Sequence, residues 1–286
     1  MLRPRWRRHA RGRAVSVRSS RSAAERRPRA ERLDGVHCVL EALRAQRRDL
    51  RRLLVSPVRG GRPGTDLAQV LDAAEAAGVP VEWVEPDALH AAEGRGNPQR
   101  VVLETGPLPE LALDALLEGT PGQRRLVVLD GVEDPQNLGA LARVAEASGA
   151  IGLVLGERRA APLGPAASRA SAGALEWLPV ARVGNLTRAI EIAKTRGFWV
   201  IAADQRAPDS LFEVERRVLS GDLAVVLGSE GKGLRPLVAS MVDHRVRIPL
   251  LGRVESLNVA TAGAVMLFEL MRIAAATAPA EPPRLS

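Results

Sequence analysis

Apolar and polar positions alternate along the chain with helical and strand periods, and they predict two successive α/β units. In the first unit, 35–45 and 66–78 show helical spacing, whereas 50–56, 80–85 and 100–106 have the composition of strands. Helices and strands that alternate in this order predict a small α/β domain of about 70 residues.

The second unit has longer apolar strands, and most of them are followed by a helical pattern. Continuous apolar strands of this kind predict a mostly parallel sheet with helices on both faces. Strands are expected at 124–131, 151–156, 198–204, 223–228 and 244–250, and helices at 137–149, 184–197, 233–241 and 256–275.

Changes in composition divide the chain into five parts. Residues 1–32 are strongly basic and are expected to form a disordered arm, and 33–106 form the first α/β domain. A linker bounded by Pro and Gly follows at 107–122. Residues 123–276 form the second domain, and 277–286 are expected to be a disordered tail.

Charge is concentrated at the N-terminus. Residues 1–32 contain 12 Arg and two Glu, whereas the whole chain has a net charge of +8, so the remainder is slightly acidic. An Arg-rich arm suits RNA, because its attraction to the phosphate backbone needs no particular base sequence. An extension without a specific role and an organelle transit peptide are alternative interpretations of the arm.

Other features of the composition exclude several classes of protein. The single cysteine, Cys38, excludes a disulfide within the chain and agrees with a reducing cytoplasm. Without Tyr and with few other aromatics, the chain does not suit binding of single strands by rows of stacked rings. No apolar run of about 20 residues predicts a membrane span. His9, His37, His90 and His244 are too scattered to predict a metal site.

A polar loop follows the strand at 124–131, and Asn137 and Arg143 lie in the helical pattern after this loop. Asn137 by itself is a good helix N-cap. Arg143 lies among Ala and Val residues, where an isolated cation is costly. Taken alone, Arg143 is therefore interpreted as a partner in a structural ion pair.

Two further segments lie toward the C-terminus. The sequence LAVVLGSEGKGLRP (223–236) runs from a strand into a Gly-rich turn that holds Glu230 and Lys232. Its glycine spacing fits neither a P-loop nor the dinucleotide fingerprint, and by itself it is a generic tight turn. The sequence RIPLLGRVESLNVATAG (247–263) contains a strand end, a loop and two candidate helix caps, Ser256 and Asn258.

In this order, N-x5-R, L-G-x-E-G-x-G and I-P followed by S-L-N-V-A resemble the three signature motifs of the SpoU (TrmH-like) family of RNA ribose 2′-O-methyltransferases, in the SPOUT superfamily. The resemblance covers residues 124–275. The segment G-V-H-C-V-L-E-A-L at 35–43 is similar to the start of the small ribosomal-protein-like substrate-binding domain of many members.

The resemblance implies a catalytic α/β domain with a C-terminal trefoil knot and S-adenosylmethionine as the cofactor. It also implies a homodimer whose active site lies near the subunit interface. The two-domain layout resembles members that methylate a guanosine of large-subunit (23S) ribosomal RNA. By motif position, the cofactor would contact Leu227, Gly228, Ile248 and Leu257, mostly through backbone groups and apolar side chains.

The same resemblance implies a catalytic set of Arg143, Glu230, Asn137, Ser256 and Asn258. Arg143 would hold a phosphate and stabilise the developing alkoxide, because a guanidinium with a pKa above about 12 is a poor free base. Glu230 would orient Arg143 or accept the proton of the 2′-hydroxyl. The two asparagines and Ser256 would position the ribose and Arg143.

Four other interpretations stay open at this point. The chain could methylate transfer RNA, or bind RNA without turnover. A nicotinamide enzyme also fits the α/β pattern, but the fingerprint G-x-G-x-x-G is missing. Cys38 could act as a nucleophile, but no partner base is evident and a buried structural thiol is favoured.

Overall fold

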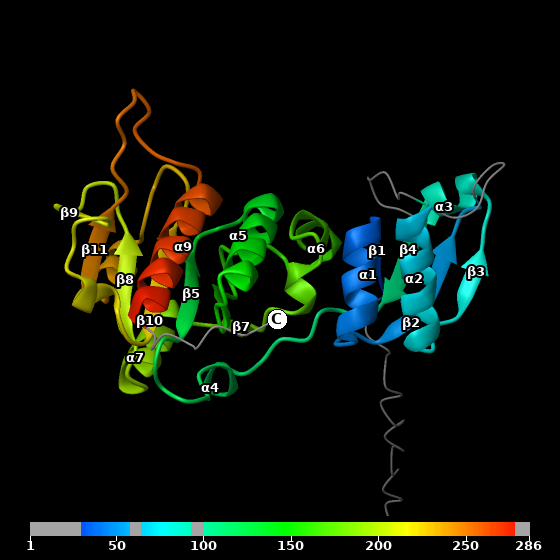
Figure 1. Ribbon diagram of the computed structural model, residues 1–286, viewed down its shortest axis with the longest axis horizontal. Helices are drawn as coiled ribbons and strands as arrows, with labels where there is room; N and C mark the ends of the chain where they lie inside the picture. Colours follow the sequence, from blue (N-terminus) through cyan, green and yellow to red (C-terminus); the bar gives the residue numbers. More distant parts are fainter. Residues whose placement is uncertain (1–29, 58–63, 93–99, 278–286) are drawn as a thin grey trace, which may run out of the picture.

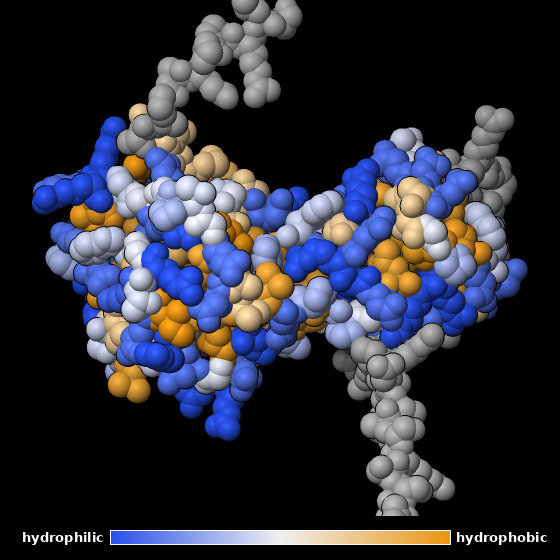
Figure 2. Space-filling view, turned by 90° about the horizontal axis from the view of Figure 1, so that it is seen from below, coloured by the Kyte–Doolittle hydropathy of each residue, from blue (hydrophilic) through white to orange (hydrophobic). Residues whose placement is uncertain are grey.

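The computed structural model describes residues 30–57, 64–92 and 100–277, which form two α/β lobes of different size (Figure 1). Seen from below, the lobes meet at a narrow waist, and the surface on one side is hollowed between them (Figure 2). Each lobe has its own sheet, and the α/β fold class that the pattern predicts is confirmed.

The N-terminal lobe is a four-stranded sheet in the order β1-β4-β2-β3, in which β4 runs antiparallel to both of its neighbours. Helices α1 and α2 cover one face, and α3 packs against the other through Leu89. The elements are β1 (Glu31–Asp34), α1 (Val36–Ala45), β2 (Leu50–Val55), α2 (Thr65–Ala76), β3 (Val81–Trp83), α3 (Pro86–Ala92) and β4 (Val101–Thr105).

All five elements predicted for this lobe are present, and β1 and α3 are additional. Glu31 and Arg32 belong to β1, so the prediction of disorder was wrong for these two residues. The short strand orders them because it pairs with β4, a contact across more than 70 residues of sequence. Residues 1–29 of the predicted arm and 278–286 of the predicted tail lie outside the described residues.

The C-terminal lobe is a seven-stranded sheet in the order β7-β6-β5-β10-β8-β11-β9, and all of its strand pairs are parallel. The elements are α4 (Leu113–Leu116), β5 (Arg125–Asp130), α5 (Pro135–Ala147), β6 (Gly152–Gly156), α6 (Pro165–Ala170), the 3₁₀ helix η1 (Ala174–Glu176), β7 (Val180–Val183), α7 (Leu186–Thr195), β8 (Trp199–Ala203), β9 (Asp209–Ser210), the 3₁₀ helix η2 (Arg216–Leu219), β10 (Leu223–Gly228), α8 (Pro236–Ala239), β11 (His244–Arg247) and α9 (Val259–Thr277).

Alternate residues of the central strands enter two separate cores. Val127 and Leu129 pack with α5, α6 and α9, whereas Leu126 and Val128 pack with α4, α7 and α8. Both faces of the sheet are therefore covered, as the continuous apolar strands predicted. Within 123–276, five short elements, α6, η1, β7, β9 and η2, were not predicted, because segments of this length have no clear period.

Helix α9 is long and apolar enough, over Val259–Ala276, to cross a membrane. In this fold it packs along the sheet and α5, and its Met266, Leu267 and Leu270 are almost fully buried. We therefore interpret α9 as a core helix, whose outer side leaves Phe268 and Met271 about two-fifths exposed.

Candidate functional site

The central strands β5 and β10 bring two of the three motif segments to one edge of the large sheet. The strands pair in parallel, with Leu129 opposite Leu227 and Asp130 opposite Gly228, so both chains leave the sheet at the same level. Ligands of open parallel sheets bind at this carboxyl edge. The loop after β5 leads into α5, and the loop after β10 is the Gly-rich turn.

The start of α5 differs from the prediction. Asp134 is the N-cap, and its side chain accepts a hydrogen bond from the amide of Gln136 at 3.0 Å, with Pro135 in the first helical position. The interpretation of Asn137 as the cap was therefore wrong. Because Asp134 takes over the capping role, the side chain of Asn137 is free for contacts outside the helix.

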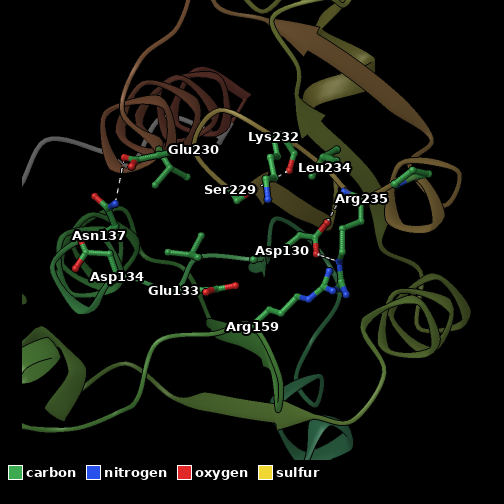
Figure 3. Close-up of a pocket in the computed structure, with 15 residues that line it drawn as sticks. Asp130, Glu133, Asp134, Asn137, Arg159, Ser229, Glu230, Lys232, Leu234 and Arg235 are labelled. Atoms are coloured by element: carbon green, nitrogen blue, oxygen red, sulfur yellow. Dashed lines mark hydrogen bonds and ion pairs between the residues drawn. The ribbon is translucent and has the colours of Figure 1, made fainter.

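The Gly-rich turn is closed by its own backbone. Ser229 and Gly233 exchange backbone hydrogen bonds of 3.2 and 2.9 Å. A Cβ atom on Gly228 would lie 2.4 Å from the carbonyl carbon of Gly233, so only glycine fits there. Gly231 and Gly233 have φ values of +75° and +65°, which favour glycine. This turn holds Glu230 toward the start of α5 (Figure 3).

Three of the predicted residues form one hydrogen-bonded cluster. Glu230 Oε1 accepts a bond from Asn137 Nδ2 at 3.1 Å and another from Asn258 Nδ2 at 2.6 Å. Asn258 Nδ2 also donates to Asn137 Oδ1 at 2.9 Å. Asn258 Oδ1 accepts from the amide of Ala260 at 2.8 Å, so Asn258 caps α9. Asn137, Glu230 and Asn258 come from three different motif segments, and each of them is hydrogen-bonded to the other two.

A cleft of about 670 Å³ opens beside this cluster. Asn137 and Glu230 line one side, and three cationic side chains, Arg159, Lys232 and Arg235, also border it (Figure 3). The full lining is Asp130, Gly131, Val132, Glu133, Asp134, Asn137, Arg159, Ser229, Glu230, Lys232, Gly233, Leu234, Arg235, Pro236 and Val259.

The cationic residues of the cleft differ in their partners. The buried carboxylate of Asp130 accepts bonds from the amide and the Nε of Arg235, at 2.8 and 2.5 Å. Arg159 is exposed, has a φ of +56°, and bonds to no other residue within the described part of the chain, and Lys232 likewise has no side-chain partner there. The sequence analysis assigned no role to Arg159, Lys232 or Arg235, although it noted Lys232 in the Gly-rich turn. An Asp at the end of a buried strand was a signal for the pair of Asp130 with Arg235.

Arg143 and Ser256 lie apart from the cluster. Arg143 is six residues beyond Asn137 on α5, which turns its side chain about 240° around the helix. It is exposed and, among the described residues, forms neither an ion pair nor a hydrogen bond, so its interpretation as a structural ion-pair partner was wrong. Ser256 is exposed in the loop before α9 and does not cap that helix.

The four residues predicted to contact a cofactor do not line the cleft. Leu227 and Ile248 are buried in the core under α5 and α9, and Leu257 packs against the same core. The carbonyl of Ile248 accepts a bond from Gln205 Nε2 at 3.1 Å. Together with Gly228, these residues form apolar walls and bring backbone segments close together near the ends of β10 and β11. Pockets for small ligands such as a nucleoside are lined mainly by apolar groups with a few backbone donors and acceptors of this kind.

Cys38 is buried, and burial raises the pKa of its thiol strongly, with the charge of Glu176 adding to the effect. A thiol held in its neutral form is not a nucleophile, which supports the structural interpretation. Within the residues that the structure describes, no group of three or more His, Cys, Asp or Glu side chains could hold a metal ion.

Comparisons with known proteins match both lobes. The family model described as the SpoU rRNA Methylase family matches residues 124–268, and the model described as RNA 2′-O ribose methyltransferase substrate binding matches 33–111. A 23S rRNA (guanosine-2′-O-)-methyltransferase, RlmB, from Burkholderia is 38% identical over 86% of this chain and 97% of its own length. A second RlmB, from Ralstonia nicotianae, is 38% identical over 84% of this chain and 94% of its own.

The fold has solved counterparts. An AdoMet-bound rRNA methyltransferase from Sinorhizobium meliloti is 28% identical, with a TM-score of 0.70 over 85% of this chain and 87% of that structure. The SpoU methyltransferase AviRb from Streptomyces viridochromogenes, 23% identical, has the same fold with a TM-score of 0.71 over 86% of this chain and 90% of its own.

Proposed function

The chain belongs to the SpoU rRNA methylase family, and on that premise we propose that it transfers a methyl group from S-adenosylmethionine to a ribose 2′-hydroxyl of a guanosine in 23S ribosomal RNA. The relatives that match it over most of its length carry this activity in their names. The observation that carries the proposal is the cluster of Asn137, Glu230 and Asn258 at the edge of an open cleft.

S-adenosylmethionine, when bound, supplies an electrophilic methyl group on a sulfonium leaving group. The chain itself must align the ribose oxygen and remove one proton. Glu230 Oε1 is held by two amide groups, and no side chain of the described residues bonds to Oε2. We assign to Oε2 the contact with the 2′-hydroxyl, and to Asn137 and Asn258 the orientation of this carboxylate.

We place the cofactor at Leu227, Gly228, Ile248 and Leu257, next to the cleft but outside its lining. The position of Gly228 and Ile248 at the carboxyl ends of β10 and β11 supports this placement, because ligands of open parallel sheets bind at that edge. In this arrangement the ends of β10 and β11 contact the cofactor, and the Gly-rich turn contacts the RNA. The loop after β10 would therefore contact both reactants.

For the RNA, we propose that the cationic side of the cleft holds a phosphate next to the target ribose. Arg159 and Lys232 have no partner among the described residues and lie within the cleft, whereas Arg235 is partly neutralised by Asp130. Residues 33–106 would hold a more distant part of the same RNA, joined to the catalytic domain at 123–276 by the linker 107–122. We expect the reaction to take place in the cytoplasm.

We also propose a homodimer in which Arg143 and Ser256 complete the site of the partner subunit. Within one chain both side chains are exposed, neither bonds to the cluster, and Arg143 has no counter-charge among the described residues. The partly exposed Phe268 and Met271 on α9 supply apolar area for such an interface. We further propose that the segment after β10 forms the trefoil knot, because β10 and β11 lie on opposite sides of β8.

The test is methyl transfer from tritiated S-adenosylmethionine to 23S rRNA from cells that lack this protein, with the site mapped by primer extension. Label in one guanosine of 23S rRNA is expected, and none in transfer RNA. Label only in transfer RNA would establish the alternative substrate. Without any label, an S-adenosylmethionine-dependent rise in Tm would still indicate a methyltransferase, whereas no rise at millimolar cofactor would indicate a non-catalytic RNA-binding protein.

A further inference from the structure

A buried arginine of the N-terminal lobe reaches into the C-terminal lobe. Arg48 follows α1 after a turn at Gln46, whose φ is +49°. Its side chain has no exposed surface. Nε and Nη2 donate to the two carboxylate oxygens of Glu176 at 2.8 and 2.9 Å, and Nη2 also donates to Ser168 Oγ at 2.8 Å. Both acceptors belong to the segment α6–η1 (165–176).

The same guanidinium is anchored in its own lobe. Nη1 donates to Glu31 Oε2 at 2.7 Å and to the carbonyl of Gly106 at 3.4 Å. A guanidinium has five N–H donors, and here five contacts use them. Burial lowers the pKa of Arg48, but hydrogen bonds and charges from Glu176 and Glu31 raise it by more. A single fully bonded cation therefore ties the two lobes at a fixed angle.

Other contacts surround this cation on the same segment and on the residue directly after it. Arg169 forms an ion pair with Asp34, and Trp177 Nε1 donates to Glu41 Oε2 at 2.8 Å. A Cβ atom on Gly173 would lie 2.6 Å from the Cβ of Glu41. The N-terminal lobe thus binds α6–η1 through directional bonds and through close packing.

On its other side, α6 touches the helix that carries Asn137 (Figure 1). A Cβ atom on Gly139 would lie 2.4 Å from the Cβ of Ala170 and 2.6 Å from the carbonyl oxygen of Ala167. Helix α5 therefore cannot shift toward α6, and Gly139 is two residues from Asn137. The segment α6–η1 lies between the N-terminal lobe and the first turn of α5.

We propose that Arg48 is a positioning residue for methyl transfer: by fixing the N-terminal lobe on α6–η1, it holds RNA bound to that lobe at one distance and angle from the cleft and keeps Asn137 in place. The role rests on the proposed function, because it concerns how the RNA reaches the cleft. A forked bond between Arg48 and Glu176 suits this task, because two parallel hydrogen bonds to one carboxylate fix its direction as well as its distance. The cofactor residues do not touch Arg48, so cofactor affinity does not depend on it.

The experiment compares Arg48→Met, Glu176→Met and the double variant, with Arg188→Met as the control. Arg188 forms an exposed pair with Glu191 within α7. The distance between spin labels at Gln69→Cys on α2 and Thr195→Cys on α7 is measured together with Tm and with kcat and KM for 23S rRNA. Cys38 is buried, so the introduced thiols are the reactive ones.

Each single variant removes one side of the buried Arg48–Glu176 pair and is expected to lower Tm. The double variant removes both buried charges and is expected to recover part of that loss, because the remaining carboxylate of Glu31 is partly exposed. In the double variant the label distances still broaden, KM for rRNA rises, and kcat/KM falls about tenfold or more, because displacement by about 1 Å is costly. Cofactor affinity stays unchanged. Where a single variant does not fold, Arg48→Lys replaces it, since Lys cannot make the forked bond.

Wild-type distances and wild-type kcat/KM in the double variant would overturn the proposal, because Arg48 would then only stabilise the fold. A wild-type protein that transfers no methyl group would contradict the proposed function instead. The label distances need no turnover, so they would still show whether Arg48 fixes the two lobes.

Discussion

Asn258 Nδ2 lies 2.6 Å from Glu230 Oε1, although the two residues belong to different loops at the carboxyl edge of the sheet. The bond joins the Gly-rich turn after β10 to the N-cap of α9. Asn137 adds a third contact from α5. A carboxylate held by two amides from two helices has a fixed direction, which is what alignment of a ribose hydroxyl requires.

Glu230→Gln is expected to lower kcat about 100-fold or more, because the amide cannot accept the proton of the ribose hydroxyl. The Tm shift produced by S-adenosylmethionine should persist, since Glu230 is not among the proposed cofactor contacts. Single-turnover methylation of 23S rRNA measures the loss. Glu146→Gln, an exposed change on α5, is the control. A Glu230→Gln enzyme with wild-type kcat would remove Glu230 from the mechanism.

Arg143→Ala should abolish most methyl transfer while it changes the free energy of unfolding by no more than about 0.5 kcal/mol. The stability is spared because Arg143 is exposed and unpaired among the described residues. Activity assays and chemical denaturation check the two parts. Arg188→Ala is the matched control, an exposed arginine on another helix. A large loss of stability without loss of activity would show that Arg143 stabilises the fold and takes no part in methyl transfer.

The proposed dimer makes a complementation test possible. Arg143→Ala and Glu230→Gln subunits are each expected to be inactive, yet mixed dimers should contain one intact site if Arg143 acts on the partner's cluster. Activity on mixing should then reach about a quarter of wild type, from random pairing. Light scattering measures the oligomeric state. A monomer, or mixtures with no activity, would place Arg143 in its own subunit's site or outside the chemistry.

Gly228→Ala is expected to destabilise the turn by about 1–3 kcal/mol and to remove the Tm shift caused by S-adenosylmethionine. The new methyl group would lie 2.4 Å from backbone that cannot move without opening the turn. Gly122→Ala, where the added atom meets nothing within 4 Å, is the control. Calorimetric titration with the cofactor checks the binding. Unchanged affinity in a folded Gly228→Ala protein would contradict the placement of the cofactor.

Arg159→Ala should weaken RNA binding and reduce the slope of log K against log salt concentration by about one, the value for one lost phosphate contact. The Tm of the Arg159→Ala protein should not fall, because Arg159 has no partner among the described residues and adopts a strained left-handed φ of +56°. Filter binding at several salt concentrations tests this. An unchanged slope would show that the phosphate is held elsewhere.

Stability in acid should depend on Glu104. A hydrogen bond from Arg52 lowers the pKa of Glu104 more than burial raises it, and Arg32 adds to the effect. A carboxyl whose folded pKa is lowered stabilises the protein above its unfolded pKa of about 4.3, and this contribution is lost as the pH falls further. Glu104→Gln should therefore lower Tm at pH 7, by the equivalent of about 1 kcal/mol.

Thermal unfolding of wild type and Glu104→Gln between pH 7 and about pH 3 measures this dependence. The difference in Tm should shrink toward the acid end, where the wild-type carboxyl becomes protonated. Arg188 and Glu191 form an exposed pair on α7, and Glu191→Gln shows how much a general change of charge contributes. A Tm difference that stays constant over the whole range would refute the ion-pair explanation.

The order of the elements could be predicted from local pattern. The period of apolar residues predicts α5, α9 and the buried strands β5 and β10 to within three residues of their observed ends. The resemblance of the three motifs to the SpoU family also selected Asn137, Glu230 and Asn258, which the structure brings together. These properties are local, because they depend on how each segment satisfies its own hydrogen bonds and presents one apolar side.

Tertiary structure alone decided which of two plausible roles each polar residue has. Asn137 and Asn258 are equally good caps in sequence, but Asp134 caps α5 and leaves Asn137 to Glu230, whereas Asn258 performs both tasks. Arg143, a plausible ion-pair partner in sequence, has no partner in the part of the chain that the structure describes. The forked bond from Arg48 to Glu176 joins residues 128 positions apart. Such contacts depend on how helices and sheets pack across the whole chain, and local period and spacing carry no information about that packing.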